Sequence, residues 1–371
     1  MNDISSLTQP ARPAASRLAI ADCDLHLGPA GLHELNPYLA QRWQDHLATF
    51  GASHRTGLQH GLPNYPKAQP AAARRDAWAP SGRPPGTDLD FTRAQHLDPN
   101  NVVLGLINPP TPSNSTLHPG LGTALARAYN EYQLEHLVHP EPRLKASIVV
   151  NYEDPAAAVA EIHHWAGHPG FGHVLLLSRT AAPMGSPHYF PIFAAAAEAN
   201  IPVAVHAFGF GGAPNTSGGW ASFYLEDMVG HAQSCQAQLA SLVMNGVFAR
   251  LPRLRFVLIE GGFGWVPALS WRLDKAYRRL RAETPELTRL PSEYIRAQVW
   301  FTTQPMEEPD PREHLLDTIA WIGWDRLLFA TDYPHWDFDD PDQALPLRIP
   351  AAQRQALMRD NALALYGPRS A

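Results

Sequence analysis

The sequence predicts an α/β protein with the architecture of a (β/α)8 TIM barrel, carrying a long loop insertion after its first strand. Eight short runs of aliphatic and β-branched residues recur along the chain, and stretches with apolar residues at helical spacing lie between them. Eightfold alternation of strand and helix is typical of this barrel. An open doubly wound sheet is the alternative, but the eight units and the lack of a glycine-rich turn after the first run favour the barrel.

The predicted strands are short and apolar enough to be buried on both faces, as the strands of a parallel sheet are. They cover residues 18–24, 101–107, 144–150, 173–178, 201–207, 255–261, 299–304 and 326–332. The helical pattern is clear over residues 122–138, 154–166, 190–200, 231–250 and 266–282. Asp154 before Pro155 resembles a helix N-cap followed by proline at the first helical position.

One domain accounts for most of the chain. Its 371 residues are 45% hydrophobic, and α/β barrels of this length remain a single domain. We assign residues 17–371 to the barrel and residues 1–16, rich in Pro and Ala, to a flexible N-terminal tail. Residues 27–100 connect the first strand to the rest. A loop this long in a compact domain is usually functional or partly disordered, so we predict a lid over the barrel mouth.

Composition and charge exclude several classes of partner. The formal net charge is -6 and there is no basic stripe, so no nucleic acid is expected. No apolar run approaches the roughly 18–20 residues that span a membrane. The first residues, with Asp3 and without an apolar segment, do not resemble a secretory signal. Cys23 and Cys235 are too few and too far apart for a disulfide framework, so we predict a reduced, cytoplasmic setting.

Ligand-type side chains end three of the predicted strands. Asp24 and His26 end the first strand, His206 ends the fifth and Asp332 ends the eighth. In a barrel the C-terminal strand ends surround the active site, and the eighth strand closes beside the first. Carboxylate and imidazole together suit Zn²⁺, Mn²⁺ or Fe²⁺. The sequence therefore predicts a mononuclear metal site with room for a water or a substrate oxygen.

The joint placement of these four residues carries the prediction. Each alone is weak evidence, because a strand-end His or an Asp before a Tyr-Pro turn is commonly structural. His206 and Asp332 are the best supported of the four predicted ligands. Asp24 ranks last, because Asp22 lies on the same face of an extended strand and is an available substitute. Cys23, between them, is predicted to face the strand–helix layer as a buried, inert thiol.

Several segments resemble one known family. They are DCDLH (22–26), VAVHAFG (203–209), PRLRFVLIEGGFGWVPALSWRLD (252–274), LLFATDYPHWD (327–337) and RDNALALYG (359–367). Over residues 18–367 the chain resembles the amidohydrolase-2 group of the metal-dependent hydrolase superfamily, which includes the aminocarboxymuconate-semialdehyde decarboxylase-like enzymes. The resemblance implies a distorted (β/α)8 barrel with one divalent metal. It also implies a ligand set, which falls on Asp24, His26, His206 and Asp332.

The sequence departs from the family pattern at two strand ends. Decarboxylases of the family usually carry a His at the end of the sixth strand, where this chain has Glu260, and this argues against the family's route to decarboxylation. Binuclear relatives use a carboxylated Lys at the end of the fourth strand, where this chain reads LLLSRT. One metal ion is therefore expected. Zinc is the first candidate, with manganese or iron as alternatives.

Three further residues are candidate catalytic groups. Glu260 is the candidate general base, because a carboxylate beside a metal-bound water can take its proton. Orienting a ligand His or capping the Gly-Gly turn is its structural alternative. His231, at the predicted start of a helix, is a candidate acid or substrate contact, and His335 follows Asp332 in the same rim loop. For both histidines a structural role is an equal or stronger alternative.

Substrate contacts are expected from side chains near the strand ends. Arg179 follows the fourth strand and is a candidate clamp for a carboxylate, which guanidinium binds in bidentate fashion; a surface ion pair is the alternative. Phe208, Trp265 and Trp336 are predicted to line an apolar pocket, although core packing explains them equally well. The same reasoning extends to other side chains of the rim and the long loop: Phe210, Trp220, Phe223, Arg55, Arg74, Arg75, Trp78 and Arg83.

Three functions fit these residues. The first is hydrolysis, in which metal-activated water attacks a C–N or C–O centre of a small aromatic or cyclic substrate with the help of Glu260. The second is nonoxidative decarboxylation, in which a rim acid protonates the carbon that loses CO₂. The third is an inactive barrel that acts as a binding module and holds no metal. We rank hydrolysis first, because Glu260 stands at the end of the sixth strand where the family's decarboxylases usually have a His. The partner is a small-molecule substrate, and the resemblance suggests a homodimer.

Overall fold

Eight parallel strands form one sheet, in the order β1 to β8 along the chain. Their bounds are β1 Ile20–Leu25, β2 Val102–Ile107, β3 Leu144–Val149, β4 Phe171–Arg179, β5 Val203–Gly209, β6 Phe256–Ile259, β7 Val299–Thr302 and β8 Leu327–Leu328. The sheet closes because the Cys23 N–H donates to the Phe329 carbonyl at 2.9 Å and the His26 N–H donates to the Tyr333 carbonyl at 2.8 Å. The predicted (β/α)8 barrel is confirmed.

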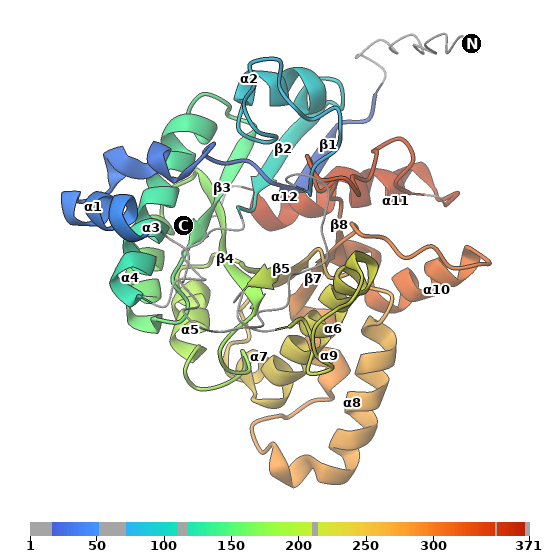
Figure 1. Cartoon of the computed structure of the whole chain (residues 1–371). Coiled ribbons are helices and arrows are strands. Elements are labelled where there is room, and N and C mark those ends of the chain that lie inside the picture. The colour runs from blue at the N-terminus through green and yellow to red at the C-terminus, as the bar shows by residue number, and fades with distance from the viewer. Residues whose placement is uncertain (1–16, 52–71, 110–117, 210–213, 346, 368–371) are drawn as a thin grey trace.

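This computed structural model describes residues 17–51, 72–109, 118–209, 214–345 and 347–367. Figure 1 shows helices around the strands, with α8 projecting from the barrel. The predicted tail, residues 1–16, lies outside the described residues. The helices are α1 Gln41–Phe50, α2 Leu89–Thr92, α3 Pro119–Gln133, α4 Pro155–Trp165, α5 Phe190–Glu198, α6 Tyr224–Met244, α7 Val247–Arg250, α8 Val266–Leu280, α9 Pro291–Gln298, α10 Glu313–Ile322, α11 Ala351–Gln355 and α12 Asn361–Tyr366. Among the described residues, none of these helices is long and apolar enough to cross a bilayer.

The helix after β5 begins earlier than its apolar periodicity predicts. The prediction was residues 231–250, but α6 starts at Tyr224. Glu226 accounts for the early start, because its carboxylate accepts hydrogen bonds from the N–H groups of Ser222 at 2.7 Å and Phe223 at 2.8 Å. These donors have no partner within the helix and need such a cap. His231 therefore lies two turns inside α6, and the prediction that it opens the helix is wrong.

The eighth strand is shorter than the predicted residues 326–332. Beyond Leu328 the backbone donors bond to side chains and leave the regular ladder. The Ala330 N–H donates to Thr303 Oγ1 at 3.2 Å, and the Thr331 N–H donates to Asp22 Oδ1 at 3.0 Å. An apolar run predicts burial here, but it does not tell which acceptors the backbone will use.

Cys23 faces the barrel interior. It packs in a small apolar cluster that takes residues from strands all round the barrel and from α12, whereas a larger cluster packs the outer strand faces against the helices. The prediction that Cys23 faces the strand–helix layer is therefore wrong. The register of β1 shifts between Asp22 and Leu25. Such a bulge breaks the alternation of side chains, so Cys23 and Asp24 both face inward while Asp22 faces the helix layer.

Part of the long connection after β1 packs on the rim of the barrel. The Arg74 N–H donates to the Pro334 carbonyl at 3.0 Å, and the Trp336 N–H donates to the Ala72 carbonyl at 2.8 Å. Ala73 and His335 form an antiparallel bridge between these bonds. Residues 52–71 lie outside the described residues. The assignment of residues 27–100 to a lid stays a prediction.

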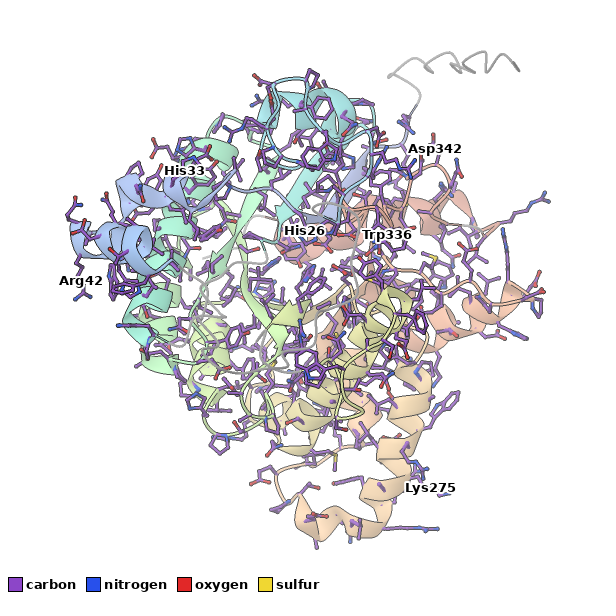
Figure 2. All side chains as sticks on the ribbon, in the orientation of Figure 1. His26, His33, Arg42, Lys275, Trp336 and Asp342 are labelled. Atoms are coloured by element: carbon purple, nitrogen blue, oxygen red, sulfur yellow. The ribbon has the colours of Figure 1, made fainter. Side chains whose placement is uncertain are left out.

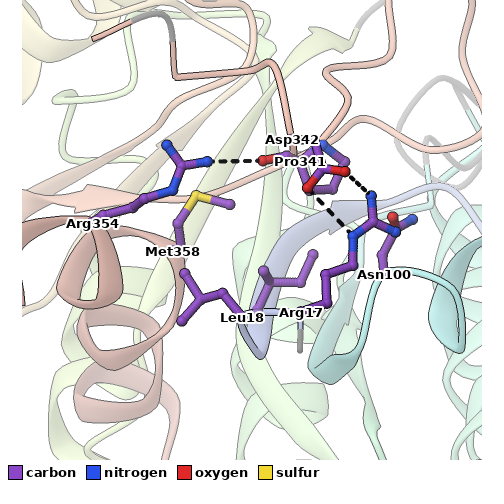
Figure 3. Close-up of a pocket in the computed structure, with 8 residues that line it drawn as sticks. Arg17, Leu18, Asn100, Pro341, Asp342, Arg354 and Met358 are labelled. Carbon is purple, nitrogen blue, oxygen red and sulfur yellow. Dashed lines mark hydrogen bonds and ion pairs between the residues drawn. The ribbon is translucent and has the colours of Figure 1, made fainter. Parts of the chain in front are cut away.

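A cavity of about 330 Å³ lies beside the start of β1, at the opposite end of that strand from Asp24 and His26 (Figure 3). An ion pair of 2.5 Å between Arg17 and Asp342 crosses it and ties the segment before β1 to the segment before α11. This cavity belongs to the N-terminal face of the barrel, where buried contacts serve stability.

Candidate metal centre and active site

The four predicted metal ligands meet at the C-terminal end of the barrel. His26 Nε2 lies 2.9 Å from Asp332 Oδ1 and 3.3 Å from Asp24 Oδ1. His206 Nε2 lies 3.5 Å from Asp24 Oδ2. All four residues are buried, and Figure 2 shows His26 near the centre of the view, among the strand ends. The structure thus brings together side chains from β1, β5 and the segment after β8.

The polar atoms of this cluster converge without satisfying one another. Four of them are buried and make no hydrogen bond among the described residues: Asp24 Oδ2, His26 Nε2, His206 Nε2 and Glu260 Oε2. Buried polar atoms normally have a partner, so this many in one place needs an explanation. One ligand atom from each of these four residues lies within 4.8 Å of the others. A divalent cation would satisfy all of them, and the residues present fit such an ion.

Neighbouring groups orient two of the candidate ligands. His206 Nδ1 lies 2.7 Å from the Ala207 carbonyl, which only accepts, so Nδ1 carries a proton and Nε2 is the nitrogen that can bind a metal ion. Asn108 Nδ2 donates to Asp24 Oδ1 at 3.0 Å, and Asn108 Oδ1 lies 2.8 Å from His173 Nε2. Contacts of this kind fix the tautomer and the direction of metal ligands.

Three carboxylates share the buried space. Burial raises the pKa of Asp332 well above its usual range, and the nearby Glu260 and Asp24 add to the effect. Burial also raises the pKa of Asp24, but His26 and His206 outweigh it and hold this pKa well below its usual range. Asp332 is therefore the carboxylate of the cluster that lacks enough positive charge beside it, and a bound divalent cation would supply that charge.

Three residues of the site have a left-handed backbone. The φ angles are 81° at Phe208, 54° at Glu260 and 63° at Asp332, at the ends of β5, β6 and β8. For residues other than glycine this conformation costs on the order of 1–3 kcal/mol each, and it persists where the surrounding structure enforces it. The coincidence of all three at one end of the barrel marks this end as the functional one.

Glu260 lies inside the cluster. Its Oε2 atom is 2.9 Å from His206 Nε2 and 4.0 Å from His26 Nε2. Its N–H donates to Thr302 Oγ1 at 3.1 Å, which fixes the start of the turn after β6. Glu260 thus occupies a position from which it can act as a further ligand or as an acceptor of a proton, and the structure adds the ligand role to the general base predicted from the sequence.

The turn after Glu260 is glycine-rich because Glu307 packs against it. The Glu307 carboxylate accepts hydrogen bonds from the Phe263 N–H at 3.1 and 3.3 Å. Gly262 has φ 62°, and a Cβ there would lie 2.6 Å from Glu307 Oε1. A Cβ at Gly264 would lie 2.9 Å from the carboxyl carbon. The GG-x-G sequence therefore reflects close approach of a carboxylate to backbone, and it holds Glu260 in place.

His231 lies beside Glu260 in the buried wall of the site. Its Nδ1 atom is 3.6 Å from Glu260 Oε1, and its Nε2 atom makes no hydrogen bond among the described residues. The Phe208 ring packs edge-on against His231 at 4.5 Å and stacks on His206 at 5.8 Å. The helix α6 and the strand β5 thus contribute one continuous wall.

His335 and Trp336 lie on the rim of the site, in the segment after β8. His335 Nδ1 lies 2.7 Å from Asp332 Oδ1, and the His335 ring lies 4.1 Å from the ring of His26. Burial lowers the pKa of His335 to about 3, and His26 adds to the effect. Trp336 donates its indole N–H to the Tyr224 hydroxyl at 2.9 Å, and it lies close to the centre of the view in Figure 2. Both side chains stand where the sequence placed them, at the mouth of the barrel.

The remaining predicted substrate contacts divide into two groups. Arg179 is half-buried at the end of β4 and lines a cavity between that strand end and α6. Trp265 contacts the turn and the core instead, since its indole N–H donates to the Gly261 carbonyl at 2.8 Å and its ring packs edge-on against Phe301. Phe223 is 72% exposed.

The other predicted rim and loop contacts are mostly engaged elsewhere or open to solvent. Arg74 pairs with Asp76, and Arg83 pairs with Glu34. Trp220 lines a separate hollow at the start of α6, while Arg75 and Trp78 are exposed. Arg55 and Phe210 lie outside the described residues.

Two buried groups of the site were not predicted from the sequence. His96 Nε2 lies 2.8 Å from Asp22 Oδ2, behind β1. His173 joins Asn108 and Ser147 beneath Asp24, with Ser147 Oγ 2.9 Å from His173 Nε2. His173 is a polar residue within the apolar fourth strand, and that was the available signal; nothing near His96 in the sequence indicates its role.

The chain is similar to known proteins over nearly its whole length. The family model described as amidohydrolase matches residues 21–367. The chain belongs to this amidohydrolase family. It is therefore a metal-dependent enzyme of that family, and the resemblance seen in the sequence is confirmed.

Curated relatives and solved structures agree with this assignment. A gamma-resorcylate decarboxylase from Rhizobium sp. (strain MTP-10005) is 25% identical over 299 residues, covering 75% of this chain and 87% of that protein. An amidohydrolase from Mycobacterium avium subsp. paratuberculosis K-10 has a TM-score of 0.68 at 22% identity, covering 95% of this chain and 99% of the other. A 5-carboxyvanillate decarboxylase from Novosphingobium aromaticivorans DSM 12444, with manganese and 4-hydroxy-3-methoxy-5-nitrobenzoic acid, has a TM-score of 0.70 at 18% identity, covering 97% and 99%.

Proposed function

We propose that this amidohydrolase is a metal-dependent, nonoxidative decarboxylase of a small hydroxylated aromatic acid. The observation that carries the proposal is the buried cluster of Asp24, His26, His206 and Asp332, on a chain whose curated relatives are decarboxylases. These relatives support the second of the three functions inferred from the sequence above the first, hydrolysis. The third, an inactive barrel, is not favoured by a cluster whose ligand atoms are all in place.

One divalent cation is proposed to bind to the four ligands, with Glu260 beside it. When bound, the cation would supply positive charge for the carboxylate and a neighbouring oxygen of the substrate. The manganese in the Novosphingobium aromaticivorans enzyme supports manganese for this chain as well. Zinc, ranked first from the sequence, and iron suit the same ligand types.

Decarboxylation needs one proton at the carbon that loses CO₂. The carbon–carbon bond breaks, its electron pair stays on the ring carbon, CO₂ leaves, and a proton takes its place. His231 is the proposed donor. The Glu260 carboxylate lies 3.6 Å from His231 Nδ1 and can orient the imidazole ring. The free Nε2 of His231 is then the atom that delivers the proton to the ring.

The walls of the site suit a flat substrate. Phe208 contacts the rings of His206 and His231, and Trp336 lies on the rim after β8, where it bonds to Tyr224 of α6. Aromatic side chains beside the cluster favour contact with an aromatic ring of the substrate. This arrangement supports an aromatic substrate over an aliphatic one.

Hydrolysis is the second candidate function, and the position of Glu260 is the observation that favours it. Its Oε2 atom lies 2.9 Å from a candidate ligand, His206, at a point where it can take a proton from a water in the cluster. Under this alternative Glu260 is the general base and His231 only orients it.

The experiment compares the two chemistries in one preparation. The purified protein is loaded with Mn²⁺ or Zn²⁺ and given gamma-resorcylate, 5-carboxyvanillate, and a panel of aryl amides and lactones. We expect CO₂ and the corresponding phenol from an aromatic acid, and a loss of about 100-fold in kcat for His231→Gln at unchanged metal content. Cleavage of an amide or lactone without CO₂ release, abolished in Glu260→Gln, would establish hydrolysis instead. A protein that binds no metal under any loading condition would establish the inactive barrel.

A further inference from the structure

A chain of hydrogen bonds crosses the inside of the barrel next to the metal cluster, from β4 to β1. It joins His173 in β4 to Asn108, which directly follows β2, and Asn108 to the candidate ligand Asp24 at the end of β1. All three side chains are completely buried. The proposed proton transfer uses neither His173 nor Asn108, so the chain needs a separate explanation.

The direction of the Asn108 amide is fixed by the backbone carbonyl of Cys23. Asn108 Nδ2 lies 3.0 Å from this carbonyl and 3.0 Å from Asp24 Oδ1. Because a carbonyl only accepts, the amide nitrogen must face it, and the two N–H groups of this nitrogen reach both oxygens. The amide oxygen of Asn108 then points the other way, toward His173 and Ser147.

His173 supplies a proton to the Asn108 oxygen. Its Nε2 atom lies 2.8 Å from Asn108 Oδ1. Burial lowers the pKa of His173 to about 3, although the Asp24 carboxylate opposes the effect, so the ring is neutral and carries one N–H. A proton on Nδ1 would be a buried donor without an acceptor among the described residues, and the bare Nε2 would face the lone pairs of the amide oxygen. The proton therefore lies on Nε2.

The Ser147 hydroxyl is the other group that contacts the Asn108 oxygen. Its Oγ atom lies 3.0 Å from Asn108 Oδ1, but it carries only one proton, and the Ile107 carbonyl accepts from the same hydroxyl. Ser147 Oγ also lies 2.9 Å from His173 Nε2. The imidazole N–H thus holds the Asn108 oxygen and the Ser147 hydroxyl together, and both would lose this donor if His173 were replaced.

The chain determines which oxygen of Asp24 is left for a cation. Asn108 occupies Oδ1, whereas Oδ2 makes no hydrogen bond among the described residues and lies 3.5 Å from His206 Nε2. A ligating carboxylate whose second oxygen is held by a donor has little freedom to turn away from the metal.

We propose that His173 is a positioning residue of the metal site, which acts through the Asn108 amide to hold Asp24 with Oδ2 toward the cation. The inference rests on the metal site of the proposed function, but it does not depend on the reaction that this site catalyses. Metal binding alone can therefore test it.

The test compares the Mn²⁺ affinities of two variants that differ in one property. Met and Gln have similar length, but only Gln carries an N–H donor. The metal-stripped full chain competes with a chromophoric chelator for Mn²⁺. We expect His173→Met to weaken binding by about 10- to 100-fold and His173→Gln by less than about threefold. A role in packing alone predicts the reverse order, because Met suits the apolar cluster inside the barrel, with Leu175 and Tyr366, better than Gln does.

Asn108→Leu tests whether His173 acts through Asn108. Leu has nearly the shape of Asn but no donor, so we expect the same loss of about 10- to 100-fold. Adding His173→Met to Asn108→Leu is expected to weaken binding by less than about a further twofold, because the effects of residues in one network do not add. Leu175→Val is the matched control. Leu175 lies two residues further along β4 in the same inner cluster, and its replacement changes apolar packing, so we expect wild-type affinity.

Melting temperatures of the metal-free proteins establish that the variants are folded. Wild-type affinity in His173→Met, or tighter binding by His173→Met than by His173→Gln, would overturn the inference. So would losses that multiply in the double variant, or a loss in Leu175→Val as large as that in His173→Met. A wild-type protein that binds no Mn²⁺ would overturn the proposed function and this inference together. The expected order of affinities without CO₂ release from any aromatic acid would count against the proposed function alone.

Discussion

Asp22 and Thr331 are joined by two hydrogen bonds across 309 positions of the sequence. The Thr331 N–H donates to Asp22 Oδ1 at 3.0 Å, and the Thr331 hydroxyl donates to Asp22 Oδ2 at 2.5 Å. Asp22 Oδ1 also accepts from the Asp24 N–H at 3.2 Å. Asp22 thus braces the backbone beside two candidate ligands, Asp24 and Asp332. The sequence ranked Asp22 as a substitute ligand, but its oxygens are used in this brace, which includes His96.

Replacing Asp22 by Asn is expected to weaken metal binding. An Asn side chain offers one acceptor oxygen where Asp22 offers two, so one of the two Thr331 donors loses its acceptor and the segment that carries Asp332 is held less firmly. Loss of such an outer contact typically lowers metal affinity by about 10- to 100-fold. Competition with a chromophoric chelator measures the affinity, and Asp342→Asn, at the other end of the barrel, is the control. A wild-type affinity in folded Asp22→Asn protein would show that the brace does not position the ligands.

His206→Ala and Asp332→Asn are each expected to remove the bound metal and leave the barrel folded. Ligand binding stabilises the folded state by about 2.7 kcal/mol at one hundred times the dissociation constant. Added Mn²⁺ should therefore raise the melting temperature of the wild-type protein and leave that of both variants unchanged. His314→Ala, at an exposed position of α10, is the control and should respond like the wild type. Full metal content in both variants would show that the ligand set is wrong.

Asp339→Asn is expected to stabilise the protein above pH 7 and to leave it unchanged near pH 4. Burial raises the pKa of Asp339 to about 7, with Asp337 adding to the effect, and its Oδ2 atom has no hydrogen-bond partner among the described residues. Because this pKa lies above the value of 3.8 in an unfolded chain, the contribution of Asp339 to stability is present below pH 4 and is lost as the pH rises to 7.

The expected gain in Asp339→Asn above pH 7 is about 1–2 kcal/mol, after allowance for partial solvent exposure. Urea unfolding at pH 4.5, 6 and 8 gives the free energy of unfolding of the variant and of the wild type. The difference between the two proteins at each pH cancels the pH dependence that comes from all other groups. Asp317→Asn, at an exposed position of α10, should show no such trend. A difference that does not grow between pH 4.5 and pH 8 would contradict the prediction.

Gly262→Ala is expected to destabilise the protein by about 1–2 kcal/mol and to lower activity, because it strains the backbone at φ 62° and displaces Glu307 from the turn after Glu260. The Cβ would lie 2.6 Å from Glu307 Oε1, so the carboxylate must move. Thermal unfolding and metal content measure the effect. Gly167→Ala is the control, since nothing lies within 4 Å of a Cβ there. Equal stability of the two variants would show that Glu307 does not enforce the turn.

The sequence by itself determined the barrel and the strand ends that carry the four candidate ligands. Eight apolar runs separated by helical periodicity require eight strands that are buried on both faces, and this depends only on local pattern. The C-terminal strand ends of a barrel share one mouth, so Asp24, His26, His206 and Asp332 were brought together by topology alone. Their separation of some 300 positions did not matter, because strand 8 always closes beside strand 1.

The tertiary structure alone decided the directions of side chains where the backbone departs from the regular pattern. The register shift in β1 turns Asp22 outward and Asp24 inward, although both stand on one face of an ideal strand. The left-handed backbone of Glu260 directs its carboxylate into the cluster. Bulges and left-handed residues are stabilised by contacts with distant parts of the chain, such as Thr331 and Glu307, and the sequence near them carries little sign of those contacts. The roles of Asp22 and Glu260 were therefore decided by the fold.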